Sequence, residues 1–271
     1  MMNKIQFWNG NKSLIRQQYE LAILNAVLDV TQSTTNLKPE VIVDYTDYPS
    51  AEDEGNVFSK GSDLLVTVAG NLKFSDKTYI PVHKPIAKGL LGYRILITRQ
   101  DFKSLLEPKY NETKRVVLEL KAGIPKTWAD AELFRENGYK VFEKGSFDEI
   151  FQHLSEGECD YVSLGANEVQ SVYQRIANTY PNLIIEPDLV LYYPFPLVFY
   201  VHPEKLNLAK RIEYGLALLT DNGQLDALFE HYFSETLREL DLGNRNVISL
   251  RNPILPEELT GTSTPSLLNV Y

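Results

Sequence analysis

The chain has few of the residues that mark disulfide-linked, metal-bound or membrane-spanning proteins. Cys159 is the one cysteine among 271 residues, so an intramolecular disulfide is excluded. The four histidines are scattered, without the spacing typical of metal ligands. No stretch approaches the roughly 18 apolar residues of a membrane-spanning helix. The 44% hydrophobic content is that of an ordinary globular protein, which we expect to be held together by its core.

Positive charge and catalytic motifs are also lacking. The 27 basic residues are outnumbered by 36 acidic ones, and the formal net charge of −9 argues against nucleic acid or an anionic membrane as the main partner. The chain has no Ser-centred nucleophile elbow, phosphate-binding loop or dinucleotide-binding glycine pattern. We therefore expect no cofactor, no metal and no enzymatic activity.

What the sequence does contain is an alternation of strand and helix patterns. Residues 5–8, 41–45 and 64–69 are typical of strands, and Ser13 precedes a helix with one apolar stripe. The order strand, helix, strand predicts right-handed crossovers and a parallel sheet. Further strands are expected at 116–124, 139–142 and 161–164, and further helices at 129–136, 146–157, 206–219 and 225–233.

Two apolar segments divide this alternation. Residues 90–97 lead into a self-contained middle region, and residues 194–201 lead back out of it. We predict two α/β lobes with mixed, mainly parallel sheets, joined by a two-strand hinge. Lobe 1 is discontinuous, with residues 1–91 and 198–271, and lobe 2 comprises residues 92–197. A hinged cleft between such lobes is a natural site for a small ligand.

Three passages carry a resemblance to a known family. Residues 63–77 contain a strand and a polar turn, residues 122–127 a strand and a helix start, and residues 206–233 a closing pair of helices. Together they resemble the type II periplasmic solute-binding proteins of family 3, which deliver amino acids to ABC importers.

A closer similarity is to a divergent, uncharacterised branch of predicted periplasmic proteins. Its motifs correspond to residues 89–94, 128–130, 165–168 and 252–256. The resemblance implies a periplasmic monomer whose signal peptide has been removed, with a small-molecule solute as ligand. It also implies an ABC permease or a membrane sensor as partner.

In lobe 1, ligand-binding candidates follow predicted strands, because open α/β sheets bind ligands at the carboxyl ends of their strands. Asn71 and Lys77 follow the third strand, as does Lys73, and at most one of the two lysines is expected to point inward. Amino-acid binders place Arg where this chain has Lys77, which lacks the two-pronged geometry that suits a carboxylate. Trp8 either contacts the ligand or packs in the core.

Lobe 2 supplies the other candidates. Lys126 and Thr127 precede a helix, where Thr127 either holds an anionic ligand or simply caps the helix, while Trp128 either packs or forms an aromatic wall. Arg94 either binds a ligand carboxylate or pairs with Glu168. The remaining candidates, Asn167, Glu168 and Tyr193, either reach the ligand or support the helix start and the hinge.

Three functions are compatible with this pattern. The first is a protein that traps a small polar solute, amino-acid-like or carboxylate-bearing, by hinge closure. The second is a secreted lyase or dehydratase on the same fold, using Glu168 with Lys77 or Arg94. The third is a sensory or scaffold protein whose cleft is filled by its own side chains.

Overall fold

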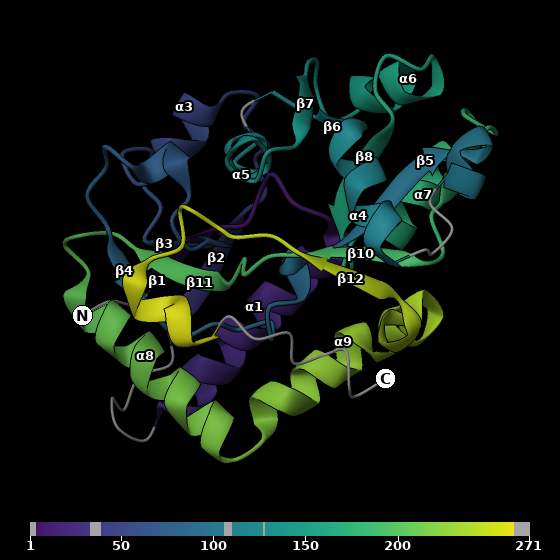
Figure 1. Ribbon diagram of the computed structural model, residues 1–271. Coiled ribbons are helices and arrows are strands. Elements are labelled where there is room, and N and C mark those ends of the chain that lie inside the picture. The colour runs from purple at the N-terminus through teal and green to yellow at the C-terminus, as the bar shows by residue number, and fades with distance from the viewer. Residues whose placement is uncertain (1–3, 33–38, 106–109, 127, 263–271) are drawn as a thin grey trace. The chain divides into compact units, whose positions relative to one another are not determined.

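The computed structural model describes residues 4–32, 39–105, 110–126 and 128–262, and it divides into two compact units (Figure 1). Unit 1 comprises Met1–Lys88, Pro196–Ser234 and Pro256–Thr260. Unit 2 comprises Gly89–Phe195 and Glu235–Leu255. No helix of the described residues is long and apolar enough to cross a membrane.

One segment falls in a different unit from the lobe in which the sequence had placed it. Residues 235–255 belong to unit 2, whereas lobe 1 was expected to include them. The reason is a strand pairing, because Asn246–Ser249 lies parallel to Leu189–Tyr192 in the unit 2 sheet. The Asn252 side chain continues this attachment by donating a hydrogen bond to the carbonyl of Pro194, at 2.7 Å.

The unit 1 sheet has the strand order β2-β1-β3-β11-β4. Its strands are β1 (Lys4–Trp8), β2 (Glu40–Asp44), β3 (Leu64–Val68), β4 (Ile80–Val82) and β11 (Leu197–Val201). The first three are mutually parallel, and β11 runs antiparallel to β3 and β4. The apolar residues of β3 are buried, as expected for a strand covered on both faces.

The described residues of unit 1 form four α-helices wholly or in part: α1 (Leu14–Val30), α3 (Ala51–Gly55), α8 (Leu206–Asp221) and α9 (Gln224–Leu240). Helix α1 buries the stripe predicted from its spacing, including Tyr19, Ile23 and Val27. Ser13 does precede this helix, but its hydroxyl makes no capping hydrogen bond. Helix α8 approaches α1 closely at Gly215, where a Cβ atom would lie 2.7 Å from the Val27 side chain.

The unit 2 sheet has the order β12-β10-β5-β8-β6-β7, with β9 also paired to β5. Its strands are β5 (Tyr93–Arg99), β6 (Lys121–Ile124), β7 (Lys140–Glu143), β8 (Tyr161–Gly165), β9 (Leu183–Ile185), β10 (Leu189–Tyr192) and β12 (Asn246–Ser249). Its helices are α4 (Tyr110–Glu119), α5 (Asp130–Glu136), α6 (Glu149–Ser155) and α7 (Val169–Ile176).

The two sheets share one topology. In unit 1 the order is β2, β1, β3, then the antiparallel β11, then β4. In unit 2, read from its other edge, the order is β7, β6, β8, then the antiparallel β5, then β10. In both sheets the first parallel strand of the unit therefore lies between the second and the third. The antiparallel strand β5 is the first strand after the chain passes into unit 2, and β11 is the first strand after it returns to unit 1. The prediction of α/β units with mixed, mainly parallel sheets is confirmed.

One predicted strand is wrong. Residues 116–120 were expected to begin a strand, but residues 116–119 form the end of α4, and the strand is confined to β6. Val117 is buried while its neighbours are partly exposed, which is the pattern of one helix face. The strand preference of consecutive valines is therefore overridden by packing.

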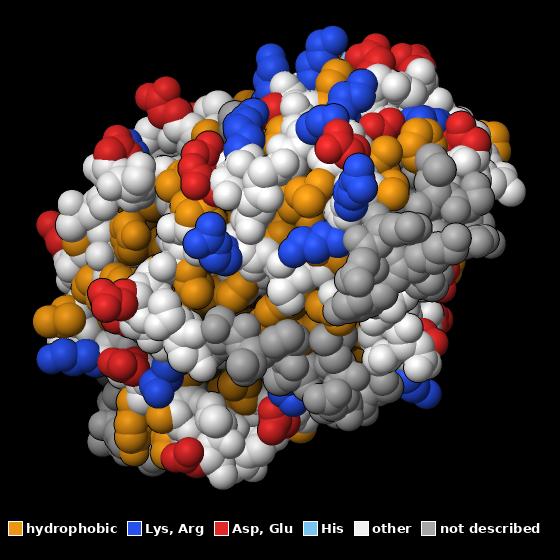
Figure 2. Space-filling model, viewed as in Figure 1, with side chains coloured by type: hydrophobic (Ala, Val, Ile, Leu, Met, Phe, Trp, Pro, Cys, Tyr) orange, Lys and Arg blue, Asp and Glu red, His pale blue; other side chains and the backbone are white. Residues whose placement is uncertain are grey.

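Charged side chains of both signs are mixed over the face drawn in Figure 2, with apolar side chains between them.

Candidate ligand-binding site

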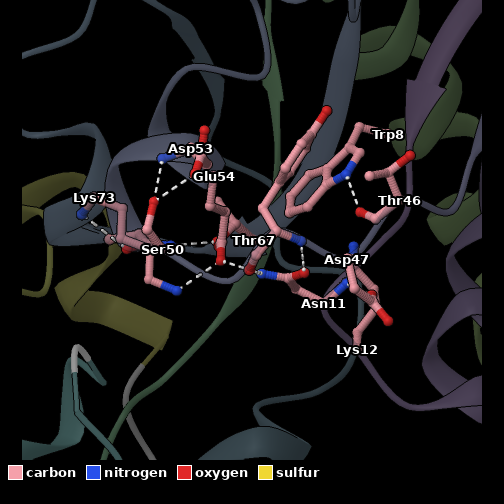
Figure 3. A network of polar contacts seen from close by, with 12 residues as sticks. Trp8, Asn11, Lys12, Thr46, Asp47, Ser50, Asp53, Glu54, Thr67 and Lys73 are labelled. Atoms are coloured by element: carbon pink, nitrogen blue, oxygen red, sulfur yellow. Dashed lines mark hydrogen bonds and ion pairs between the residues drawn. The ribbon is translucent and has the colours of Figure 1, made fainter. Parts of the chain in front are cut away.

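The carboxyl ends of β1, β2 and β3 meet at one edge of the unit 1 sheet, which we call the unit 1 edge. Asn11 connects the loops there, as Figure 3 shows. Its backbone amide donates to the Asp47 carboxylate at 2.6 Å, and its side-chain amide donates to Tyr48 O at 2.8 Å and to Glu54 at 3.0 Å. Asn11 has a φ of 55°, a left-handed conformation that asparagine tolerates better than most residues. Asn11 thus ties its own loop to the loop after β2 and to helix α3.

Two lysines of the unit 1 edge form ion pairs within the unit. Lys12 Nζ lies 2.6 Å from the Glu20 carboxylate, and these side chains are only 3% and 0% exposed. Lys73 Nζ lies 2.7 Å from the Glu54 carboxylate. Burial lowers the pKa of the Lys12 ammonium, although Glu20 opposes that shift. Arg16 Nη2 also lies 2.7 Å from the Glu20 carboxylate, so Lys12 shares its partner with a second cation, whereas Lys73 is paired with Glu54.

The predicted residues of unit 1 lie at this edge in different roles. Trp8 is 2% exposed, and its indole N–H donates to Thr46 O at 3.0 Å. Asn71 is buried and caps a short 3₁₀ helix, accepting a hydrogen bond from the Lys73 amide at 3.1 Å. Lys77 is partly exposed, 3.2 Å from the exposed carboxylate of Asp76. Of the three, Lys77 is the most accessible.

The unit 2 edge is formed by the carboxyl ends of β6, β7, β8 and β10, together with the start of the antiparallel strand β5. At its centre Arg94 lies 2.6 Å from the Asp130 carboxylate, with side chains 2% and 7% exposed. The guanidinium also donates to Ser163 O at 3.0 Å and to Leu91 O at 3.3 Å. Tyr193, fully buried, donates its hydroxyl proton to the same Asp130 carboxylate. Three elements are thus joined by one buried carboxylate.

Electrostatics favour an ionised Arg94. Burial lowers the pKa of its guanidinium, but the negative charges of Asp130 and Glu168 oppose that effect, and the pKa lies above its usual value. Burial likewise raises the pKa of the Tyr193 hydroxyl well above its usual value, so Tyr193 stays a proton donor. The guanidinium and the Asp130 carboxylate neutralise each other.

Glu168 and Asn167 follow β8 at this edge. From sequence, Glu168 was one possible partner of Arg94, but the ion pair found among the described residues is with Asp130. Glu168 Oε1 instead accepts a hydrogen bond from the Gly165 amide at 3.2 Å. Asn167 is 5% exposed, and its Oδ1 has no hydrogen-bond partner among the described residues. Glu168 Oε1 lies 3.5 Å, and Asn167 Oδ1 lies 2.5 Å, from the position that a Cβ atom would take if Gly165 were replaced by a larger residue.

The loop after β6 carries the other predicted residues of unit 2. Lys126 is exposed, and its amide donates to Gly145 O at 3.0 Å. Trp128 is half-buried and stacks on Phe147, with ring centroids 5.4 Å apart. Thr127 lies outside the described residues. An aromatic pair and an exposed cation therefore border the unit 2 edge.

Sequence reasoning missed the residues that pair with the buried cations. Asp130 belongs to the motif at residues 128–130, but no role was predicted for its side chain. Glu20 lies on the apolar stripe of α1, where a carboxylate is not expected. A usable signal existed for Asp130, because an acidic residue in the first turn of a helix is often fixed there. No comparable signal marked Glu20.

Comparison with models of protein families gives no match, and comparison with curated proteins gives none either. Solved structures do match along most of the chain. A histidine kinase sensor domain with similarity to periplasmic binding proteins is 16% identical, with a TM-score of 0.57, covering 86% of this chain and 96% of that one. The chain has the fold of periplasmic binding proteins.

Two further matches have the same fold. A periplasmic His/Glu/Gln/Arg/opine family-binding protein from Silicibacter pomeroyi, in complex with lysine, is 12% identical with a TM-score of 0.56, covering 86% of this chain and 97% of that one. An amino acid ABC transporter substrate-binding protein from Streptococcus pneumoniae, bound to L-arginine, is 13% identical with a TM-score of 0.55, covering 86% and 96%. The resemblance seen in the sequence is confirmed at the level of this fold.

Proposed function

We propose that the protein binds a small polar solute that carries a protonated amine, an amino acid or a related compound. The two units act as the two lobes, and hinge closure between them traps the solute. A membrane transporter or a membrane sensor then recognises the closed form. The periplasm is the compartment in which such a protein would work.

The unit 2 edge carries this proposal. Arg94 and Asp130 compensate each other at 2.6 Å, and the Glu168 carboxylate beyond them adds a further negative charge. Glu168 has no ion-pair partner of its own among the described residues, and beside it the buried Oδ1 of Asn167 has no donor there. Buried polar atoms are normally satisfied, so an acceptor of this kind favours a ligand that donates hydrogen bonds. An ammonium group meets both requirements, with its charge and its three donors.

Other edge residues suit the rest of an amino acid. Lys126 and Lys77 are accessible cations that would face a ligand carboxylate. The Asn71 amide already bonds to Thr67 and to the Lys73 amide, and only its second N–H would be left for a ligand. Trp128, stacked on Phe147, offers an aromatic surface to the ligand side chain. Two structural neighbours are complexes with lysine and with L-arginine, which supports an amino acid as ligand.

Three predicted ligand contacts suit a supporting role better. Trp8, Arg94 and Tyr193 are at most 2% exposed and are bonded to their own unit. We propose that they fix the loops that carry Asn71, Trp128 and Glu168. A substitution at such a position would alter ligand affinity through the loop rather than through lost contact.

The test is isothermal titration calorimetry of the full chain with L-arginine, L-lysine, L-glutamine and amines that lack the carboxylate. Glu168→Gln removes the negative charge with little change in shape. A hydrogen bond to a charged group contributes about 1.5–3 kcal/mol, so the variant should bind about 10- to 150-fold more weakly. Glu136→Gln, at an exposed position of α5, is the matched control and should bind like the unaltered protein.

Each part of the proposal can fail separately. Binding to none of these compounds would contradict amine-solute binding altogether. Equal affinity of Glu168→Gln and the unaltered protein would leave solute binding intact but refute the ammonium site. Amines that bind as tightly as the amino acids would show that no carboxylate is recognised.

A ligand-free sensory or scaffold protein is the second candidate, and the unit 1 edge favours it. Lys12 and Lys73 are already paired with Glu20 and Glu54, as expected of a site filled by its own side chains. The lyase alternative gains less support, because Arg94 is held by Asp130 and two carbonyls rather than free to meet a substrate.

A further inference from the structure

We propose a divalent metal site in unit 2, formed by His153, Glu156 and Glu158 where α6 ends. It is independent of solute binding and uses none of the residues discussed above. One imidazole and two carboxylates form a donor set that suits zinc and its neighbours among the transition metals.

The ligand atoms are already close together. One nitrogen of His153 and one carboxylate oxygen from each glutamate lie within 4.8 Å of one another. The closest pair is His153 Nδ1 and Glu158 Oε2, at 3.2 Å. Two ligands bound to one zinc ion at 2.0–2.1 Å in tetrahedral geometry lie about 3.3 Å apart. The His153–Glu158 pair therefore has the spacing of two ligands that share an ion.

His153 presents an unsatisfied nitrogen to this cluster. Its Nδ1 is buried and makes no hydrogen bond among the described residues. The ring is positioned by an edge-to-face contact with Phe142, with centroids 5.4 Å apart. The Nδ1 atom and the Glu158 carboxylate oxygen face each other at 3.2 Å, where a lone pair on each can be directed at one shared metal ion.

The backbone holds two of the ligands in fixed relation. The Glu158 amide donates to His153 O at 2.9 Å, and the Gly157 amide donates to Leu154 O at 3.1 Å. Gly157 has a φ of 83°, the left-handed conformation that ends a helix and turns the chain back. Glu158 is thereby directed toward His153. Only the spacing of histidines was considered in the sequence, so this mixed set of ligands was overlooked.

Two neighbours compete for the carboxylates. Lys144 Nζ lies 3.6 Å from Glu158 Oε2, on a side chain that is 60% exposed. Gln152 donates to Glu156 Oε1 at 2.8 Å. An exposed lysine is free to move into solvent when a dication binds, and the second oxygen of Glu156 remains available. Mg²⁺ and Ca²⁺, which prefer oxygen ligands, should bind far more weakly.

The test is zinc titration of the full, untagged chain at pH 7.5 in competition with a chromophoric chelator. We expect one zinc ion per chain, with affinity at least about tenfold lower in His153→Gln, because one of three ligands is lost. His231→Gln, which removes an exposed histidine from α9, is the matched control and should bind like the unaltered protein.

A second measurement does not depend on the chelator. Zinc should raise the melting temperature of the unaltered protein and of His231→Gln, but not that of His153→Gln, since only a ligand that binds the folded state stabilises it. Circular dichroism without metal confirms that the variants are folded. Equal zinc affinity in the two variants, no binding at all, or equal affinity for Mg²⁺ would each overturn the proposal.

Discussion

The contribution of the hydrogen bond from Tyr193 to the buried Asp130 carboxylate can be measured by comparing two Tyr→Phe substitutions. Tyr193→Phe removes the hydroxyl that donates to Asp130, without changing the packed volume of the ring. A hydrogen bond to a charged group contributes about 1.5–3 kcal/mol, and both side chains are buried, so screening by water is small. We expect the free energy of unfolding of unit 2 to fall by about 2 kcal/mol.

Tyr161→Phe is the matched control. Tyr161 is equally buried in the same unit, but its hydroxyl has no hydrogen-bond partner among the described residues. Removing an unpaired buried hydroxyl should leave stability unchanged or raise it by about 1 kcal/mol. The two substitutions are chemically identical, so their difference reports the bond to Asp130 alone.

Urea unfolding followed by tryptophan fluorescence measures both variants. The two tryptophans lie in different units, and in a shared Trp8→Phe background Trp128 reports unit 2 alone. Equal losses of stability in Tyr193→Phe and Tyr161→Phe would refute the reasoning. So would a loss below about 0.5 kcal/mol in Tyr193→Phe, because a buried bond to a carboxylate should exceed that value.

Two further predictions concern Lys12 and Gly165. Burial lowers the pKa of Lys12 in the folded protein below 10.5, its value in the unfolded chain. At any pH between these two pKa values, Lys12 is protonated in the unfolded chain but not in the folded protein. Stability should therefore rise with pH through that window, by at most about 1.4 kcal/mol per pH unit, and urea titrations of Lys12→Met should lack this rise. In Gly165→Ala the new Cβ would meet Asn167 Oδ1 at 2.5 Å and displace it. Calorimetry should then give at least about tenfold weaker solute binding, and unchanged affinity would contradict the placement of the ammonium site.

Much of the fold could be predicted because it follows from periodicity and chain order. The apolar run of β3 and the stripe of α1 have the spacing of the elements that they form. Residues 116–120 could not be assigned in this way, because a short apolar run fits a strand as well as a buried helix face. The attachment of β12 to unit 2 was also inaccessible, since it depends on pairing with a strand far away in sequence.

The candidate site was predictable only in its location. The rule that ligands bind at the carboxyl ends of parallel strands led to Asn71, Asn167 and Glu168. That rule does not predict which charged residues form ion pairs, however. Arg94 was expected to pair with Glu168 or with a ligand, whereas it pairs with Asp130. Pairing of buried charges is decided by three-dimensional proximity, which one sequence without its fold does not contain.

The shared topology of the two sheets has a consequence for synthesis on the ribosome. In unit 1, β11 fills the place between β3 and β4, so that sheet stays divided until Val201 has been made. In unit 2, every strand except β12 is present once Tyr192 has emerged, and β12 occupies the outer edge. The later-starting unit can therefore assemble its sheet first, while the N-terminal strands wait for their missing neighbour. Nascent chains should gain protection from proteolysis in the middle of the sequence before they gain it at the beginning.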